Sequence, residues 1–276
     1  MDAPLNHVLI PVSFSELFSV WNRFPAAVPY AGGTNIIEKK ETDILNLPPV
    51  FICLDKIEEL HKITRTEQYL EIGAMVKLNS LLRLGKKVPH VISKCIENIA
   101  GVQVRNIATI GGNICSSRLR DLPAPLIALD AQYELRNTDG TRWVSASRFH
   151  SNTEDTGIGN QELLTRIRLP LHQWDYSLYK KFKSEELFSG QSVVFLAKTQ
   201  KSILTEIRVV YKGNEILRNK DAETILNGKY LPLNKKTADE FDSSWKEFLY
   251  SKQNETEFAK NAVLNTIHEN VFNLSE

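Results

Sequence analysis

Short apolar runs and one helical repeat alternate along the first 55 residues. Residues 7–12 (HVLIPV) form an apolar run that predicts a strand. Ser13 is suited to cap a helix whose large apolar side chains recur at positions i, i+3, i+4 and i+7. These side chains are Phe14, Leu17, Phe18 and Trp21. Residues 27–30 and 46–54 predict two more strands, so we expect a small α/β subdomain that closes near residue 55.

Farther along, the pattern predicts a β-hairpin and then a second, smaller domain. Residues 132–136 and 141–144 flank an Asn-Thr-Asp-Gly turn, a combination typical of hairpins. After Pro170, apolar stretches predict three antiparallel strands, at residues 179–183, 192–198 and 206–210. Helical repeats follow, and the last one presents an apolar side made of Phe258, Ala262, Leu264, Ile267 and Val271. The pattern thus predicts a smaller α+β domain after Pro170.

Two glycine pairs follow predicted strands and are the leading candidates for ligand binding. Residues 27–30 run into the first glycine loop, residues 31–35. Residues 107–110 predict a short buried strand that runs into the second glycine loop, residues 111–113. Glycine permits φ > 0 and close approach to a ligand, and successive N–H groups in such a turn suit a phosphate. The two loops could hold one diphosphate from both sides, although a glycine pair is as often a simple turn.

The residues around both pairs carry a family resemblance. The segments are YAGGTNI (30–36) and QVRNIATIGGNI (103–114). Together they resemble the FAD-binding subunit or domain of the xanthine dehydrogenase and carbon monoxide dehydrogenase family, which are molybdenum hydroxylases. Weaker likeness extends through FICLDKIEELHKI (51–63), LEIGAMVKLNSLL (70–82) and ELLTRIRLP (162–170). The resemblance therefore covers the first 170 residues well and the remainder poorly.

This resemblance implies a fold and a domain division. The implied fold class is α+β: a PCMH-type, vanillyl-alcohol-oxidase-like FAD-binding domain of two subdomains, followed by a smaller α+β domain. We expect the FAD-binding domain over residues 1–170, with subdomains at about 1–55 and 56–170. The C-terminal domain of residues 171–276 is expected to hold a three-stranded antiparallel sheet and helices.

The resemblance also implies which residues contact FAD. Most of them lie in or beside the two glycine loops: Pro29, Tyr30, Ala31, Gly32, Gly33, Thr34, Asn35, Ile36, Ile99, Thr109, Ile110, Gly111, Gly112 and Asn113. Backbone N–H groups of residues 31–35 and 111–113 would meet the diphosphate, with side-chain donors from Thr34, Thr109 and Asn113. The alternative for these three side chains is the capping of local turns.

Three more positions follow from the same resemblance. Asp121 matches an acidic residue near the ribose and adenine of FAD, and its alternative role is to cap the helix that leads into residues 123–129. Leu164 and Lys181 fall where the family has later flavin contacts, and Lys181 is otherwise a solvated lysine.

The chain departs from the family pattern after the second loop and in the C-terminal domain. Residues 116–121 (SSRLRD) are one residue shorter and lack a proline, which predicts weaker retention of FAD. Arg118 and Arg120 in this stretch either contact phosphate, form a docking surface or are merely solvated. Glu185 and Ser189 replace an Arg and an Asp, and residues 211–215 replace a Gly-rich turn. These changes leave the diphosphate contacts intact and affect the flavin-ring surroundings and partner docking.

Composition narrows the chemistry further. A length of 276 residues and a net charge of +1 give no reason to expect a nucleic acid or acidic membrane partner, and no run reaches the ~18–20 apolar residues of a membrane span. No signal peptide is visible, and Cys53, Cys95 and Cys115 are expected to be buried thiols in the cytoplasm. Three cysteines cannot supply the four ligands of a 2Fe–2S cluster, and the six histidines show no metal-ligand spacing.

These observations favour an electron-transfer flavoprotein subunit. FAD is expected to be non-covalent, because neither glycine loop contains His or Cys, and Cys115 lies just outside. The subunit would take electrons from iron–sulfur clusters of one partner and pass them to NAD⁺ or another acceptor, with molybdopterin on a second partner. No catalytic side chain and no metal ligand is assigned to this chain. The alternatives are a scaffold whose flavin site has degenerated and a stand-alone flavin oxidoreductase.

Overall fold

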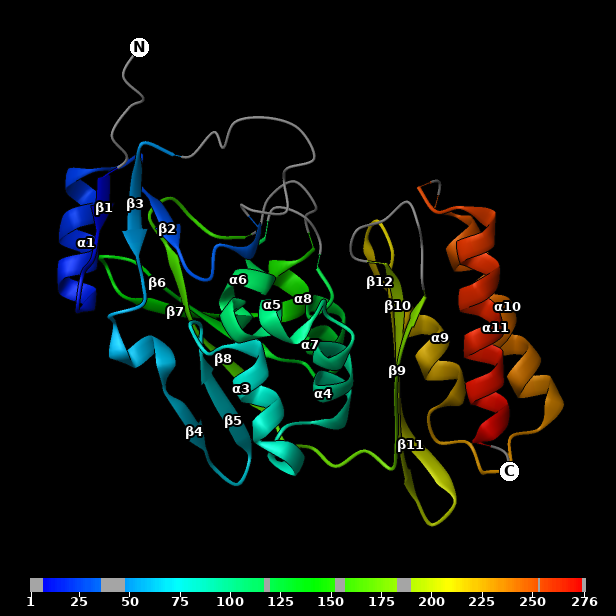
Figure 1. Cartoon of the computed structure of the whole chain (residues 1–276). Coiled ribbons are helices and arrows are strands. Elements are labelled where there is room, and N and C mark those ends of the chain that lie inside the picture. The colour runs from blue at the N-terminus through cyan, green and yellow to red at the C-terminus, as the bar shows by residue number, and fades with distance from the viewer. Residues whose placement is uncertain are drawn as a thin grey trace. The chain divides into compact units, whose positions relative to one another are not determined.

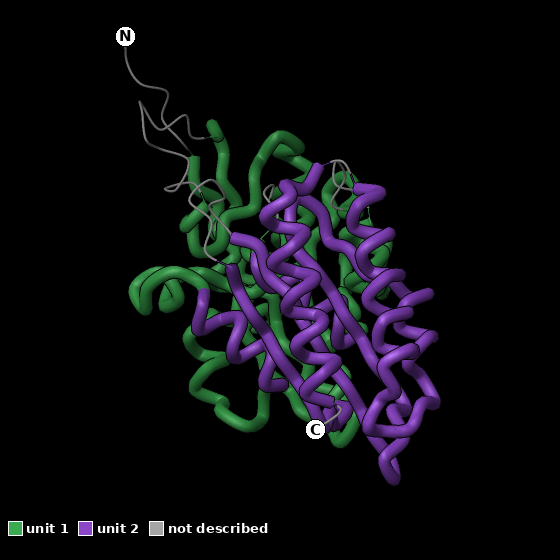
Figure 2. Tube along the Cα trace, turned by 90° about the vertical axis from the view of Figure 1, so that its right-hand side faces the viewer, with its two compact units in different colours: residues 1–88, 99–120, 130–171 green, residues 89–98, 121–129, 172–276 purple. Residues whose placement is uncertain are grey.

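The computed structural model describes residues 7–35, 48–116, 120–151, 157–182, 190–252 and 254–274. Four residues that enter the expectations above lie outside these ranges: Ile36, Arg118, Glu185 and Ser189. The chain forms two compact units (Figure 2). Unit 1 comprises residues 1–88, 99–120 and 130–171, and unit 2 comprises residues 89–98, 121–129 and 172–276. The chain therefore passes between the units five times, instead of once near residue 170.

Unit 1 begins with a three-stranded parallel sheet in the order β1-β3-β2. The strands are β1 (His7–Leu9), β2 (Val28–Tyr30) and β3 (Val50–Cys53). Helix α1 (Phe14–Arg23) connects β1 to β2, as parallel strands require a crossover. The strand–helix–strand prediction for this region is confirmed. The sequence could predict these elements because a short apolar run and an amphipathic repeat are both local signals.

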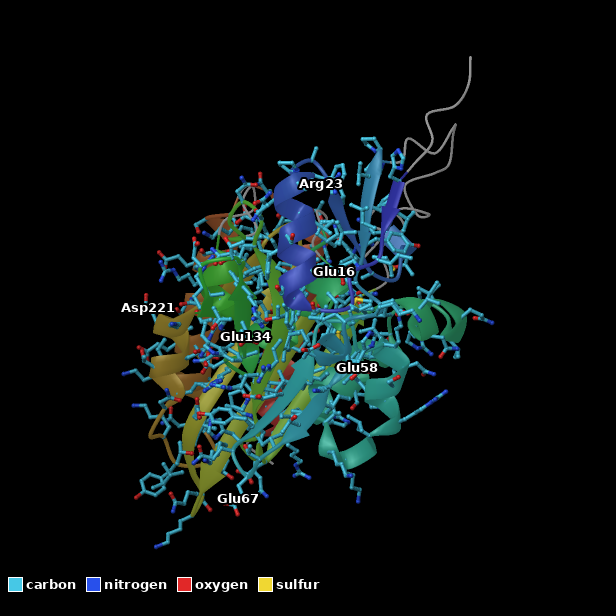
Figure 3. The ribbon with its side chains drawn as sticks, turned by 90° about the vertical axis from the view of Figure 1, so that its left-hand side faces the viewer. Glu16, Arg23, Glu58, Glu67, Glu134 and Asp221 are labelled. Carbon is cyan, nitrogen blue, oxygen red and sulfur yellow. The ribbon has the colours of Figure 1, made fainter. Side chains whose placement is uncertain are left out.

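Helix α1 has the predicted cap and the predicted buried face. The Ser13 side chain accepts a hydrogen bond from Glu16 N (3.2 Å), and Phe14, Leu17, Phe18 and Trp21 are buried. Glu16 lies in the first turn and Arg23 in the last (Figure 3), so both charges complement the helix dipole.

A five-stranded antiparallel sheet completes unit 1, in the order β4-β5-β8-β6-β7. Its strands are β4 (Ile63–Arg65), β5 (Tyr69–Gly73), β6 (Gln132–Arg136), β7 (Thr141–Ser145) and β8 (Leu163–Pro170). The hairpin prediction is confirmed: Asn137 Oδ1 accepts hydrogen bonds from the N–H groups of Asp139 and Gly140 in the β6–β7 turn.

Short helices of unit 1 lie between these strands. They are η1 (Glu58–His61), α3 (Leu78–Arg83), η2 (Gly85–Lys87), α5 (Val102–Ile107), α6 (Ile110–Ile114) and α8 (Ala146–Phe149). The predicted strand at residues 107–110 is wrong. Ile107 ends α5 and Ile110 begins α6, and Thr109 alone forms an isolated bridge, with Lys77. The β-branched residues suggested a strand, but two short helices meet here.

Unit 2 contains a four-stranded antiparallel sheet in the order β12-β11-β10-β9. The three predicted strands are present as β9 (Tyr176–Phe182), β10 (Gln191–Gln200) and β11 (Ile203–Lys212). The expectation of only three strands is corrected by β12 (Ile216–Arg218), which pairs with the end of β11. A strand of three residues is too short to give a clear alternating pattern.

Helices cover both faces of this sheet within unit 2 (Figure 1). One face packs on α9 (Lys220–Leu226), α10 (Lys235–Tyr250) and α11 (Glu257–Asn273), and the other contacts α4 (His90–Glu97) and α7 (Pro123–Ala128). Strand β10 is therefore buried on both faces, which explains its unbroken apolar run at residues 193–197.

The predicted apolar side of the last helix is wrong at its first position. Phe258 is 77% exposed, whereas Ala259, Val263, Ile267 and Val271 are buried at four-residue intervals. In the first turn the buried position is Ala259, one residue after Phe258. No helix in the described part of the chain is long and apolar enough to cross a membrane.

Candidate cofactor site

The first glycine loop begins where β2 ends, at Tyr30. Gly33 has φ +68°, and a Cβ added there would lie 2.3 Å from the Tyr30 hydroxyl oxygen. Both the conformation and the lack of space therefore require glycine at this position. Thr34 and Asn35, which follow it, are helical.

The backbone donors of this loop remain open. Among the described residues, the N–H groups of Gly32, Gly33 and Thr34 have no hydrogen-bond acceptor. A left-handed residue followed by helical residues directs successive N–H groups to one side, which forms a concavity for an anion. The first glycine loop thus has the features expected of a phosphate-binding turn.

The second glycine loop is the first part of helix α6. Thr109 is 1% exposed, and its Oγ1 accepts a hydrogen bond from Gly112 N (3.0 Å), so Thr109 is the N-cap of α6. The capping alternative for Thr109 is the arrangement that the structure contains. Gly111 is required by close packing, because a Cβ there would lie 2.8 Å from Ala74 Cβ.

The backbone donors of this second segment are already engaged, contrary to the expectation of an open array. Ile110 N donates to Val76 O (3.0 Å) and Gly111 N donates to Ala74 O (2.9 Å). Gly112 N bonds to the Thr109 side chain, and Asn113 N donates to Thr109 O (3.0 Å). The expectation treated Gly111 and Gly112 as a turn, whereas a capped helix uses these donors internally.

The structure brings the two segments into direct contact within unit 1. A Cβ added to Gly32 would lie only 2.1 Å from the carbonyl oxygen of Ile107, at the end of α5. The backbone of the first glycine loop therefore lies directly against the residues that lead into α6, about 75 positions away in the sequence. This juxtaposition is the one that a shared diphosphate would need.

Arg120 also connects these segments, a contact that the sequence did not indicate. Its Nη2 donates to Asn35 Oδ1 (2.5 Å) and its Nε donates to Ser116 Oγ (3.1 Å). Asn35 belongs to the first glycine loop, and Ser116 lies two residues after α6. Arg120 is thus not a freely solvated surface residue.

The other predicted contacts of unit 1 differ in exposure. Pro29 and Tyr30 are half-buried in β2, and Ile110 is fully buried. Leu164 is buried in β8, and Ile99 is buried before α5 with its carbonyl bonded to Arg105 Nη1 (2.8 Å).

Asp121 and Lys181 lie in unit 2 and engage each other. Lys181 Nζ is 3.0 Å from Asp121 Oδ1 and donates to Asn98 O (3.1 Å), and the Asp121 side chain is only 7% exposed. Asp121 is not the cap of α7, whose N-cap is Leu122 without a side-chain bond. Asp121 therefore does not cap a helix, and Lys181 is not simply solvated.

Two of the three cysteines, Cys95 and Cys115, hold buried thiols. Burial, and secondly the charge of Asp121, raises the pKa of the Cys95 thiol. Cys115 is partly exposed as a residue, but its thiol is buried and burial raises its pKa to about 12. The expectation of buried thiols therefore holds for Cys95 and Cys115, whereas Cys53 is partly exposed. In the described ranges, no group of three or more His, Cys, Asp or Glu residues is placed to hold a metal ion.

Comparison with known protein families shows the family of this chain. Residues 4–172 match the family described as the FAD binding domain in molybdopterin dehydrogenase, which covers more than half of the chain. The chain belongs to this family. The resemblance drawn from the two glycine motifs is therefore confirmed.

Relatives of this FAD-binding domain occur in long and short chains. Xanthine dehydrogenase 2 of Arabidopsis thaliana is 31% identical over 79% of this chain, which spans only 18% of that protein. The carbon monoxide dehydrogenase medium chain of Afipia carboxidovorans is 30% identical over 74% of this chain and 73% of its own length. The chain therefore spans less than a fifth of the plant relative but most of the medium chain.

A solved structure shows the same fold over the whole FAD-binding chain. The match to a chain of quinoline 2-oxidoreductase from Pseudomonas putida 86 has a TM-score of 0.83 and 21% identity. It covers 100% of this chain and 98% of the other. The mixed α+β architecture, including the C-terminal region beyond the family match, is therefore shared.

Proposed function

We propose that this chain binds one FAD non-covalently and transfers electrons through it, as a subunit of a molybdenum hydroxylase complex. The observation that carries the proposal is the contact of Gly32 with the Ile107 carbonyl, which places the open N–H groups of the first glycine loop beside α6. Bound FAD would supply the redox chemistry, accepting and releasing electrons one or two at a time.

The residues of the first glycine loop fit the diphosphate of FAD. Gly32, Gly33 and Thr34 supply backbone donors that need no side-chain ordering. The Asn113 side chain, half-exposed in α6, would contribute from the other side, and the exposed Gly112 beside it would leave room for the diphosphate. No Cys or His lies in residues 31–35 or 111–113 to form a covalent flavin link, and the Cys115 thiol is buried.

The proposal of partners rests on the cysteine count and on the names of relatives. A 2Fe–2S cluster requires four ligands, and the chain has three scattered cysteines. Relatives are called medium chains or subunits, of carbon monoxide dehydrogenase and of nicotine 6-hydroxylase. We therefore place iron–sulfur clusters on one partner and molybdopterin on another, with NAD⁺ or a different acceptor oxidising the flavin. The cysteine usage supports a cytoplasmic location.

A visible spectrum of the purified full chain tests this proposal. We expect flavin absorption at about one FAD per chain, no stoichiometric iron or molybdenum by elemental analysis, and no hydroxylase activity. Thr34→Asp should remove bound FAD, because a negative charge in the first glycine loop would repel the diphosphate, whereas Thr138→Asp in the β6–β7 turn should not. Iron or molybdenum in the isolated chain would contradict the assignment of partners.

One observation keeps a scaffold role as the second candidate. All four N–H groups of residues 110–113 are bonded within the protein, so only the first glycine loop offers open backbone donors. A purified chain that contains no FAD and does not bind added FAD would favour the scaffold. Oxidation of NADH by the chain without partners would instead indicate a stand-alone flavin oxidoreductase.

A further inference from the structure

Arg120 joins two segments that are distant in the sequence. Its Nη2 donates to Asn35 Oδ1, which is 85 positions away, and its Nε donates to Ser116 Oγ. Asn35 ends the described part of the first glycine loop, and Ser116 follows α6. Arg120 is half-buried in unit 1, so these bonds are partly shielded from water.

We propose that Arg120 is a positioning residue that holds the first glycine loop against the end of α6 and so pre-forms the diphosphate site. The proposal rests on the proposed function, because it is tested by FAD affinity and the first glycine loop is proposed to bind FAD. It differs from a direct phosphate contact, because the two guanidinium nitrogens described above point to Asn35 and Ser116.

The physical reason lies in the composition of the loop. Residues 31–35 contain two adjacent glycines, which have more backbone freedom to lose than other residues. The rigid, planar guanidinium can hold two acceptors on two segments at a fixed separation, which a lysine cannot do. A loop that is ordered before the ligand arrives subtracts less from affinity. Residues 116–121 contain no proline to restrict the backbone. The guanidinium bridge would restrict this segment and the first glycine loop instead.

A double-mutant cycle on the full chain tests the bridge. Arg120→Met and Asn35→Ala should each weaken FAD binding to apoprotein roughly tenfold, as expected for one charge-assisted hydrogen bond. The double variant should bind FAD no more weakly than the weaker single variant, because each change removes the same interaction. Arg83→Met, at an exposed position at the end of α3, is the matched control and should leave the affinity unchanged.

Two further readouts separate positioning from direct contact with phosphate. Arg120→Lys keeps the charge but not the two-acceptor geometry, so it should remain impaired. The salt dependence of FAD affinity should be the same in Arg120→Met as in wild type, because no charge on the ligand loses its partner. Losses that multiply in the double variant, full rescue by Arg120→Lys, or a reduced salt dependence would each overturn the proposal.

The thermal stability of the four cycle proteins without FAD gives an independent answer. Non-additive shifts in melting temperature between Arg120→Met and Asn35→Ala would show that the bridge forms in the absence of ligand, and additive shifts would refute it. If the wild-type chain does not bind FAD, the proposed function fails. The bridge is then judged by this stability cycle alone.

Discussion

Three glycines of the candidate site differ in what surrounds them. Gly32 permits backbone contact with the Ile107 carbonyl, and Gly111 permits contact with Ala74. Gly112 is exposed, and the nearest atom to an added Cβ there is the Thr109 hydroxyl oxygen, at 2.9 Å. The sequence shows only two similar Gly-Gly pairs. Substitutions at these positions therefore differ in what they disturb.

Replacing Gly32 with Ala should abolish FAD binding. A methyl group 2.1 Å from the Ile107 oxygen cannot be accommodated, so the first glycine loop would have to move away from α5 and α6. The ratio of flavin to protein absorbance should fall to near zero, with the far-UV circular dichroism unchanged. Gly159→Ala is the control, because its Cβ would meet nothing closer than 3.4 Å. Normal flavin content in Gly32→Ala would contradict this account of the loop.

The Arg142–Glu162 pair should make stability depend on pH in the acid range. Glu162 is 7% exposed and accepts Arg142 Nε and Nη2 at 2.7 and 2.6 Å, and these bonds lower the pKa of Glu162. A carboxyl with a lowered folded pKa contributes stability above its unfolded pKa of about 4.5 and loses it as the pH falls through the folded value.

Glu162→Gln should therefore lower stability at pH 7 by about 1–3 kcal/mol. Its melting temperature should approach that of wild type as the pH falls below about 4.5. Glu97→Gln, in the exposed Lys94–Glu97 pair, should change little at any pH. An equal deficit at pH 7 and pH 3 would mean that packing, not the charge pair, is responsible.

Elements with local signals were predicted well, and those set by distant contacts were not. Helix α1 has a cap and four buried side chains within ten positions, so its pattern is self-contained. The strand expected at residues 107–110 failed because Thr109 caps a helix whose first donors bond to Ala74 and Val76, far away in the sequence. No local pattern shows such partners.

The same reason limits what the sequence said about the site. Each glycine motif is contiguous, so the sequence alone indicates both motifs and predicts that they hold one diphosphate from both sides, but it does not predict their direct contact. The Asp121–Lys181 pair and the Asn35–Arg120 bond join residues 60 and 85 positions apart. A single sequence taken alone gives no signal for either pair, because the partners of Asp121, Lys181 and Arg120 are far away along the chain.

The cap of α6 is expected to matter for both stability and binding. Thr109→Val keeps the volume but removes the acceptor of Gly112 N, which should cost about 1 kcal/mol. The melting temperature of the apoprotein should fall by roughly 2–4 °C, and FAD affinity should fall with it. Thr109→Ser retains the hydroxyl and should restore most of both. Equal behaviour of the two variants would show that the hydroxyl is dispensable.

At the scale of the whole molecule, each compact unit is built from three separate segments of the sequence. Helices α4 and α7 are followed by unit 1 segments, yet they pack on β9, β10 and β11 within unit 2. Their apolar side chains Ile92, Ile96 and Leu126 are fully buried. A cut near residue 171 would therefore leave both helices without the sheet that covers them.

A chain ended at Leu171 should not fold as a stable domain, although it contains almost all of the family match. The uncovered faces of α4 and α7 should produce aggregation or binding of a hydrophobic dye such as ANS. The full chain under the same conditions is the control. A truncated chain that is monomeric and unfolds cooperatively would show that α4 and α7 need no cover.

The placement of α7 also affects how the chain folds during its synthesis. Ala128 ends α7, and Lys212 ends the strand β11 on which it packs, about 80 residues later. Synthesis at roughly 5–20 residues per second separates these two events by about 4–16 s. Until β11 is complete, α7 lacks part of the surface that buries it, although α4, which it also contacts, has already been synthesised. The nascent chain should therefore depend most on chaperones in this interval.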